Sequence, residues 1–255
     1  MKIKFSFSFF LGFCFLLLLL SKGAFAQPES IPFPALDVNV RPSGSPSDVA
    51  LTLQIIALIT ILSLAPAIVL MVTSFTRILV VLGFVRQSIG LQQLPPNQVL
   101  VTLALFLTFF TMSPVWQQIY NNSITPYVEG KIPTSEAYGK AIKPLRDFMF
   151  SQVGDEELSL MVSLAEMPQP KNHDDVPTRV LIPAFMIGEL KKAFQMGILI
   201  FIPFIVVDMI VASILLSMGM IMLPPMLVSL PFKVLLFVVA DGWDLVIYSV
   251  VSSFK

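Results

Sequence analysis

The fold class is decided by residues 193–223, AFQMGILIFIPFIVVDMIVASILLSMGMIML, a stretch with one charged side chain, that of Asp208. The apolar residues follow one another without the alternation that is typical of an amphipathic strand. The stretch is also longer than the ~20 residues with which an α-helix crosses a bilayer. Since only helices and closed barrels satisfy all their backbone polar groups in hydrocarbon, it predicts a membrane helix.

Three other segments have the same character. Residues 49–76 and 87–128 contain no charged side chain, and residues 231–251 contain three. The whole chain is 56% hydrophobic and 13% charged, whereas soluble domains carry roughly 25% charged residues. The sequence therefore predicts an all-α, multi-helix membrane protein with four apolar segments.

Prolines mark the turns of two long, broken helical hairpins, residues 49–121 and 193–255. Because proline has no backbone N–H and a fixed φ, the pairs at 95–96 and 224–225 are expected to begin the returning helices. Three further prolines lie inside apolar runs and are expected to kink or break their helices: Pro66, Pro114 and Pro203. Such prolines are either simply tolerated in membrane helices or belong to a gate.

The first 26 residues are typical of a cleavable signal peptide. The apolar run from Phe5 to Leu20 follows a basic start, and Ala26 ends a small-residue cleavage pattern. An uncleaved first helix is the alternative, although the run is short for a span. The only cysteine, Cys14, lies in this peptide, so we expect no disulfide or thiolate metal site in the mature chain. Residues 27–48 are expected to be a flexible periplasmic tail.

Residues 122–192 are the most polar part of the chain and are expected to form a small helical segment in the periplasm. Residues 135–146 and 155–167 can form helices, the second with acidic residues in its first turn, where the helix dipole favours them. This orientation follows from residues 77–86, which contain two Arg and no acid and therefore predict a cytoplasmic loop. The 219–230 turn would then face the cytoplasm, and both ends of the mature chain would face the periplasm.

Few side chains in the sequence are suited to chemistry. The single histidine, His173, has no second histidine or cysteine nearby to complete a metal site. Asp208 and Asp241 could be the two carboxylates that share a proton in an intramembrane aspartyl protease, but nothing else in the sequence supports such a site. We therefore expect no catalytic residue, no metal and no cofactor. The formal net charge of zero gives no indication of a nucleic-acid partner.

Two charges in the second hairpin need partners, because an ionised side chain at mid-membrane costs roughly 2.5–3.5 kcal/mol. Asp208 lies 16 residues before Pro224, whereas Lys233 lies 8 residues after Pro225. In an ideal hairpin this spacing puts them about 12 Å apart in depth, so they are badly matched within one chain. We expect the pair to form between axially staggered copies; the alternative is that each charge reaches water separately.

The turn of the second hairpin is rich in methionine. Four methionines surround Gly219 and the proline pair: Met218, Met220, Met222 and Met226. Methionine is unbranched and deformable, so a ring of these side chains from several copies could close a pore and still yield to a passing chain. Lipid-facing methionines are the simpler interpretation. Gly219 would allow the backbone to leave helical geometry.

Short motifs, in order along the chain, resemble those of the FliP family of flagellar export proteins. In the first half they are 71–77 (MVTSFTR), 85–87 (VRQ), 95–100 (PPNQVL), 104–110 (ALFLTFF) and 112–114 (MSP). In the second half they are 182–185 (IPAF), 189–191 (ELK), 193–195 (AFQ), 201–204 (FIPF), Asp208, 218–220 (MGM), 223–225 (LPP), 230–233 (LPFK) and 241–243 (DGW). The resemblance is weakest at about 122–178.

The resemblance implies a channel-forming subunit of the flagellar type III protein-export gate, needed for flagellum assembly and protein secretion. It implies a homo-oligomer, expected to be a pentamer, with FliQ-like and FliR-like subunits, other export-apparatus proteins and unfolded export substrates as partners. The implied assembly is a helical cone held largely above the bilayer plane, in which apolar segments pack on sister subunits. The implied location is the bacterial inner membrane and the flagellar basal body.

The resemblance also implies roles for individual residues. A pore gasket maps to Met218, Gly219, Met220, Ile221 and Met222, followed by the turn at Pro224 and Pro225. Ile221 departs from the three consecutive methionines that are frequent in the family. Contacts between subunits map to Asp208, Lys233 and Glu189.

Two other functions are compatible with these patterns. A paralogous gate subunit of a virulence injectisome would share the motifs, although the signal peptide and the long polar segment favour the flagellar version. An ion-coupled small-molecule transporter would use Asp208 as a proton site and would take up its substrate without partner subunits.

Overall fold

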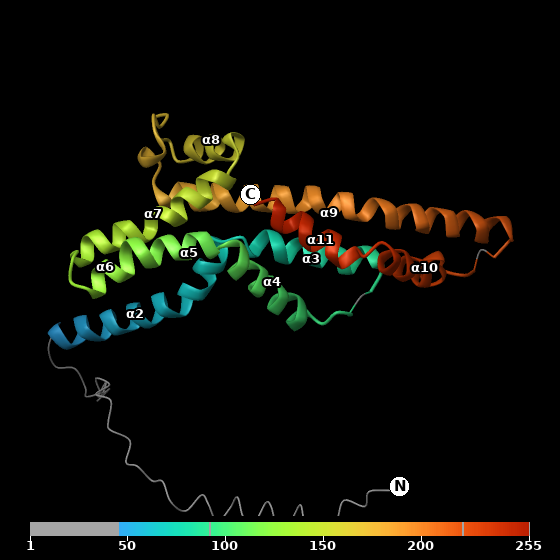
Figure 1. The fold of residues 1–255 in the computed structure, drawn as a ribbon, viewed down its shortest axis with the longest axis horizontal. Helices are drawn as coiled ribbons and strands as arrows, with labels where there is room; N and C mark the ends of the chain where they lie inside the picture. Colours follow the sequence, from blue (N-terminus) through green and yellow to red (C-terminus); the bar gives the residue numbers. More distant parts are fainter. Residues whose placement is uncertain (1–45, 92, 221, 255) are drawn as a thin grey trace, which may run out of the picture. The chain divides into compact units, whose positions relative to one another are not determined.

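The computed structural model describes residues 46–91, 93–220 and 222–254, so the predicted signal peptide and most of the predicted tail lie outside the described residues. Within these ranges the chain forms helices and no strands, which confirms the all-α prediction (Figure 1). The helices are α2 Pro46–Met71, α3 Phe75–Ile89, α4 Asn97–Thr111, α5 Ser113–Ile119, the π-helix η1 Tyr120–Ile124, α6 Thr125–Val128, α7 Thr134–Gln152, α8 Asp155–Leu164, the 3-10 helix η2 His173–Asp175, α9 Thr178–Ser217, α10 Pro225–Val239 and α11 Gly242–Ser252.

The chain divides into two units, residues 1–53 and 54–255. In the first unit the structure describes the beginning of α2, which starts at Pro46, inside the predicted tail. The second unit contains the rest of α2 and all the helices that follow it.

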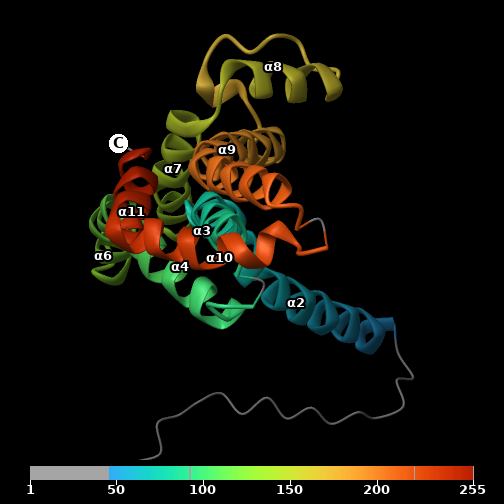
Figure 2. The same ribbon diagram turned by 90° about the vertical axis from the view of Figure 1, so that its right-hand side faces the viewer.

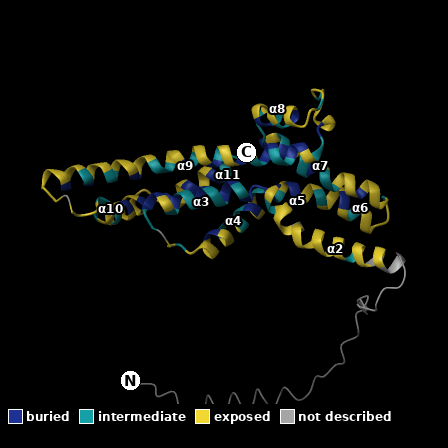
Figure 3. Cartoon of the chain, turned by 180° about the vertical axis from the view of Figure 1, so that it is seen from behind, coloured by how far each residue is buried: buried dark blue, intermediate teal, exposed yellow. Residues whose placement is uncertain are grey.

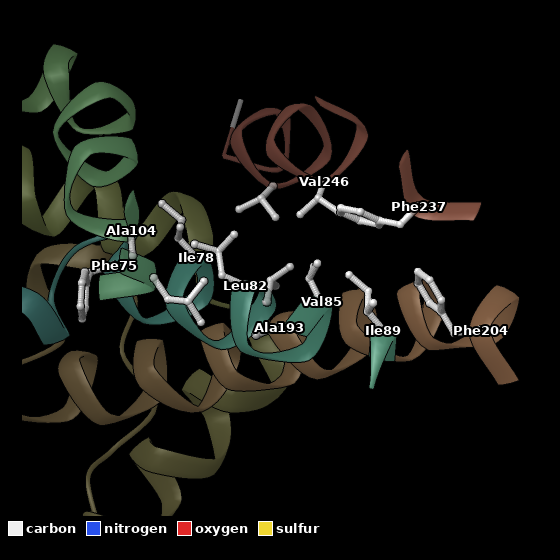
Figure 4. Packing of buried hydrophobic residues seen from close by; sticks show 13 residues of the cluster. Phe75, Ile78, Leu82, Val85, Ile89, Ala104, Ala193, Phe204, Phe237 and Val246 are labelled. Atoms are coloured by element: carbon white, nitrogen blue, oxygen red, sulfur yellow. The ribbon is translucent and has the colours of Figure 1, made fainter. Parts of the chain in front are cut away.

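Helix α3 lies at the centre of the second unit, in contact with α4, α9, α10 and α11. Its buried apolar residues recur every three or four positions, the spacing of one helix face. They are Phe75, Ile78, Val81, Leu82, Val85 and Ile89. Figure 4 shows this face between α9 on one side and Phe237 and Val246, from α10 and α11, on the other. Gly197 of α9 allows a close approach, because a Cβ there would lie 2.5 Å from the ring of Phe84.

This central helix takes the place of a predicted loop. Residues 77–86 lie within α3, and the Arg77 side chain is fully buried. The predicted orientation of the chain across the membrane stays a prediction. The loop-charge rule counts arginines that stay in water beside the membrane. Arg77 instead has an acidic partner inside the protein, which a count of loop charges does not consider.

Among the residues that the structure describes, two helices are long and apolar enough to cross a membrane, Thr52–Met71 within α2 and Thr178–Ser217, which is α9. Two bent pairs also pass if each is counted as one span: Asn97–Thr111 with Ser113–Val128, and Pro225–Val239 with Gly242–Ser252. The bends are 57° and 64°. The four predicted apolar segments therefore correspond to two single helices and two broken ones.

The effects of the internal prolines differ from one helix to the next. Pro114 follows the break between α4 and α5, as expected, but Pro66 and Pro203 lie inside unbroken helices. Both proline pairs do begin returning helices: α4 starts after Pro96, and α10 starts at Pro225. A proline is tolerated in the first turn because its missing N–H would have no helical partner there.

The polar segment contains both predicted helices. The first, α7, is longer than expected, and the second, α8, begins with Asp155, Glu156 and Glu157 in its first turn. Lys191 donates hydrogen bonds to Glu156 and Glu157 and so fastens α8 to α9. The hydrogen bond from Lys191 holds the pKa of Glu157 below its usual value. The segment does not end at residue 192, because α9 begins at Thr178 and continues without a break.

Candidate functional site: a methionine-rich tip and two buried ion pairs

The tip of the second hairpin is the short connection between the end of α9 at Ser217 and the start of α10 at Pro225 (Figure 1). The Met222 side chain is 97% exposed and that of Met218 68% exposed. Met220 is 40% exposed. The predicted gasket residues thus lie together at this tip, except Ile221, which lies outside the described residues. The predicted turn residues Pro224 and Pro225 follow directly.

Gly219 explains why α9 ends where it does. Its φ is +74°, in the left-handed region that glycine adopts without steric cost. The N–H of Gly219 donates to the carbonyl of Leu216, and the N–H of Met220 donates to that of Leu215. These two bonds are the Schellman pattern that closes a helix end. The end of α9 is therefore well defined, and Met218 and Met220 lie within this closing turn.

An apolar groove of about 500 Å³ lies between α9 and α10 beside the tip. Met218 and Met220 line it at one end, and Val207 and Phe232 contribute walls from the two helices. Figure 3 shows that much of this half of α9 is exposed. Deformable methionines at the end of an apolar groove can change rotamer without disturbing a packed core.

Asp208 and Lys233 are paired within this one chain. Lys233 Nζ donates to Asp208 Oδ2 at 2.5 Å, and Ser229 Oγ donates to Asp208 Oδ1 at 2.5 Å. Lys233 Nζ also donates to the backbone carbonyl of Ser88, 3.4 Å away, at the end of α3. The side chain of Lys233 is 6% exposed and that of Asp208 31% exposed. The pair therefore holds α9, α10 and α3 together.

The prediction that Asp208 and Lys233 lie at different depths in one chain is wrong. The expected depth of Asp208 assumed that the helix continues to Pro224. Helix α9 instead ends at Ser217, and the residues after it form the turn. Asp208 is therefore nine residues from its helix end and Lys233 eight residues from its helix start, which corresponds to about 14 and about 12 Å. The two side chains lie at nearly the same depth. Asp241 is instead exposed at the bend between α10 and α11.

A second ion pair joins Arg77 of α3 to Glu189 of α9, and here neither side chain has any exposed surface. Arg77 Nε donates to Glu189 Oε2 at 2.9 Å, and Arg77 Nη2 donates to the other carboxylate oxygen. Arg77 Nη2 also donates to Gln152 Oε1 at 3.0 Å. Arg77 Nη1 donates to the backbone carbonyl and to the hydroxyl of Ser253, at 3.0 and 2.9 Å. The ring of Phe254 lies 3.9 Å from the guanidinium carbon.

Within this chain none of the Glu189 side chain reaches the surface, and its contact with a neighbouring subunit stays a prediction. The arrangement also includes residues to which the sequence analysis assigned no role in a site: Arg77, Gln152, Ser253 and Phe254. The spacing of apolar residues at 75–89 could have predicted that Arg77 lies on a helix. Position 77 falls near the apolar face that includes Ile78. Its partners lie 75 to 176 residues away in sequence, and no local pattern connects them.

The described residues contain no group of three or more His, Cys, Asp or Glu side chains that could hold a metal ion. His173 lies in the polar segment, where its ring stacks on that of Phe150 at 4.2 Å. Arg146 crosses the same region and donates to the backbone carbonyls of His173 and Val176. These contacts close the loop between α8 and α9.

Comparison with known proteins identifies the chain's relatives. The family model described as "FliP family" matches residues 58–250. The flagellar biosynthetic protein FliP of Bacillus subtilis is 48% identical over 85% of this chain and 98% of its own length. FliP of Borreliella burgdorferi is 48% identical over 97% of this chain and 98% of its own length. FliP of Caulobacter vibrioides is 52% identical over 79% of this chain and 76% of its own length. This chain therefore belongs to the FliP family.

Proposed function

We propose that this chain is a channel-forming subunit of the flagellar type III protein-export gate and has no catalytic role. It acts as a homo-oligomer, a pentamer, together with FliQ-like and FliR-like subunits in the inner membrane and flagellar basal body. The signal peptide is cleaved, and the new N-terminus is periplasmic. Membership of the FliP family, whose relatives are named as flagellar biosynthetic proteins, supports this assignment.

The observation that carries the proposal is the size of the exposed apolar surface on α9. The helix has 40 residues and is about 60 Å long. Only 17% of its most apolar window is buried within the chain. The apolar part of the helix, residues 193–217, is about 38 Å long, which exceeds the hydrocarbon layer of about 30 Å that a bilayer provides. The remaining apolar surface needs other protein to cover it, and sister copies can supply the same helix in the same orientation.

The placement of charge agrees with such an assembly. Lys233 and Arg77 are neutralised inside the chain, so neither presents an unpaired charge on the apolar faces of the hairpin. The tip ends in methionines, of which Met222 is almost fully exposed. Around a common axis, these flexible side chains would close a narrow channel and yield to an unfolded substrate.

The transporter alternative depends on Asp208 accepting and releasing a proton. Lys233 and Ser229 both donate short hydrogen bonds to this carboxylate, one to each oxygen. Both carboxylate oxygens are thus occupied by donors from the same chain, which tie Asp208 to α10. The geometry therefore favours a structural role for Asp208.

The proposal predicts several copies of the chain in one particle. The protein should be co-expressed with FliQ-like and FliR-like partners and extracted in detergent, and its copy number should be measured by native mass spectrometry. We expect five copies in the wild type. Leu199→Glu, on α9, should abolish the particle, because a carboxylate placed in the apolar interface loses its hydration.

Leu164→Glu is the matched control, because Leu164 lies on α8 and is 67% exposed against 68% for Leu199. It should leave the copy number unchanged. A particle containing a single copy in the presence of its partners would contradict the proposal, as would equal effects of the two substitutions.

A further inference from the structure

The buried guanidinium of Arg77 joins its own helix, α3, to three parts of the chain that are far away in sequence. Its partners are Glu189 on α9, Gln152 at the end of α7, and Ser253 and Phe254, which directly follow α11. We propose that residues 253–254 form a latch that Arg77 holds in place, and that this latch positions the α10–α11 hairpin. Arg77 is then a positioning residue for the methionine-rich tip.

All the N–H donors of the Arg77 guanidinium have acceptors only when the latch is in place. A guanidinium has five N–H donors and no acceptor. Glu189 accepts two of these hydrogen bonds and Gln152 accepts one. The remaining two go to the backbone carbonyl and hydroxyl of Ser253. If the latch leaves, two charged donors remain buried without partners, and this makes release unfavourable.

Phe254 gives the latch an apolar contact as well. Its ring lies over the guanidinium, with the ring centroid 3.9 Å from Cζ, within the range of a cation–π interaction. The same ring stacks with Phe148 of α7 at 6.3 Å. Gln152 Nε2 lies 3.5 Å from the backbone carbonyl of Phe254. The latch is therefore recognised by α3 and α7 together, through polar and aromatic contacts.

The latch fixes one end of a bent pair of helices whose other part is already fixed. In α10, Lys233 is bonded to Asp208 and to the carbonyl of Ser88. Beyond the 64° bend, α11 packs Val246 and Val250 into the core and ends at the latch. Figures 1 and 2 both show the end of α11 beside α7. The bent pair is therefore tied to α3 at two places, Lys233 in α10 and the latch after α11.

The test is a thermodynamic cycle on the purified full chain. Deletion of residues 253–255 should lower the apparent melting temperature by about 5 °C or more, because it leaves two charged donors without partners. The same deletion in the Arg77→Met/Glu189→Leu background should lower it by less than about 2 °C, because no buried donors are left there. Equal losses in the two backgrounds would overturn the latch.

A conservative variant keeps the test decisive if the double variant does not fold. Lysine at position 77 can still pair with Glu189, but it has no planar fork with which to reach Ser253 at the same time. In an Arg77→Lys background the deletion should therefore have a much smaller effect than in the wild type. The same loss in both would contradict the latch. The cycle compares variants at one protein concentration and in one assembly state, so failure of the latch and failure of the proposed gate are separate results.

Discussion

Replacing Glu189 with alanine is expected to remove most of the folded chain. The substitution leaves the guanidinium of Arg77 buried without its counterion, and breaking a buried ion pair in this way costs about 3–5 kcal/mol. Folded domains are typically stable by only about 5–15 kcal/mol. The yield of detergent-extracted, protease-resistant protein measures the effect, and we expect a large drop.

The matched control is Glu156→Ala. Glu156 also pairs with a basic residue, Lys191, but its side chain is 86% exposed. Exposed pairs contribute between about zero and 1 kcal/mol, so this control should behave like the wild type. Replacing both members of the buried pair, as Arg77→Met/Glu189→Leu, should recover much of the loss. Equal yields for Glu189→Ala and Glu156→Ala would show that the buried pair does not stabilise the fold.

Asp208→Ala is expected to have the next largest effect, because it leaves the ammonium group of Lys233 almost fully buried without an acidic partner. The loss should be about 2–4 kcal/mol, smaller than for Glu189 because the Asp208 side chain is partly exposed. The charge swap Asp208→Lys/Lys233→Asp in one chain should recover part of it. Recovery stays partial because an aspartate at 233 could not donate to the carbonyl of Ser88.

Mixing the single variants distinguishes a pair within the chain from a pair between copies. If the pair is within the chain, co-expression of an Asp208→Lys chain with a Lys233→Asp chain gives no recovery, because each chain still contains two like charges. If the pair crosses between copies, the mixture recovers assembly at the contacts where complementary chains meet. The amount of assembled particle in the mixture, compared with that of each single variant, distinguishes the two arrangements. Full recovery in the mixture would contradict the contact seen in this chain.

Local sequence patterns predicted the helical elements well. Uninterrupted apolar runs indicated the four candidate spans, and the acidic first turn of α8 and the proline pairs marked helix starts correctly. These features depend on hydrophobic length, the helix dipole and the missing N–H of proline, and all three act within a few residues.

Features that depend on distant partners were not predictable in this way. Arg77 was expected in a loop because residues 77–86 contain two Arg and no acid, and its acidic partner, Glu189, lies 112 residues away. The depth of Asp208 relative to Lys233 was misjudged because it depends on where α9 ends, and the left-handed Gly219 ends it at Ser217. The start of α9 was missed for a related reason: residues 178–192 are amphiphilic, and their buried face is covered by α3, α7 and α8.

The central claim is that identical copies bury their apolar faces against one another and bring their methionine tips together. Cysteine cross-linking in cells tests this claim most directly, because the sequence contains a single cysteine, Cys14, which can be replaced by serine. Met222→Cys should then be joined into covalent dimers by a short bifunctional maleimide, because each chain carries one thiol and each reagent molecule links two of them. Leu164→Cys, on α8 and 67% exposed, should remain monomeric. If Met222→Cys also remained monomeric while the chain was assembled with its partner subunits, the tips would not meet and the account would be wrong.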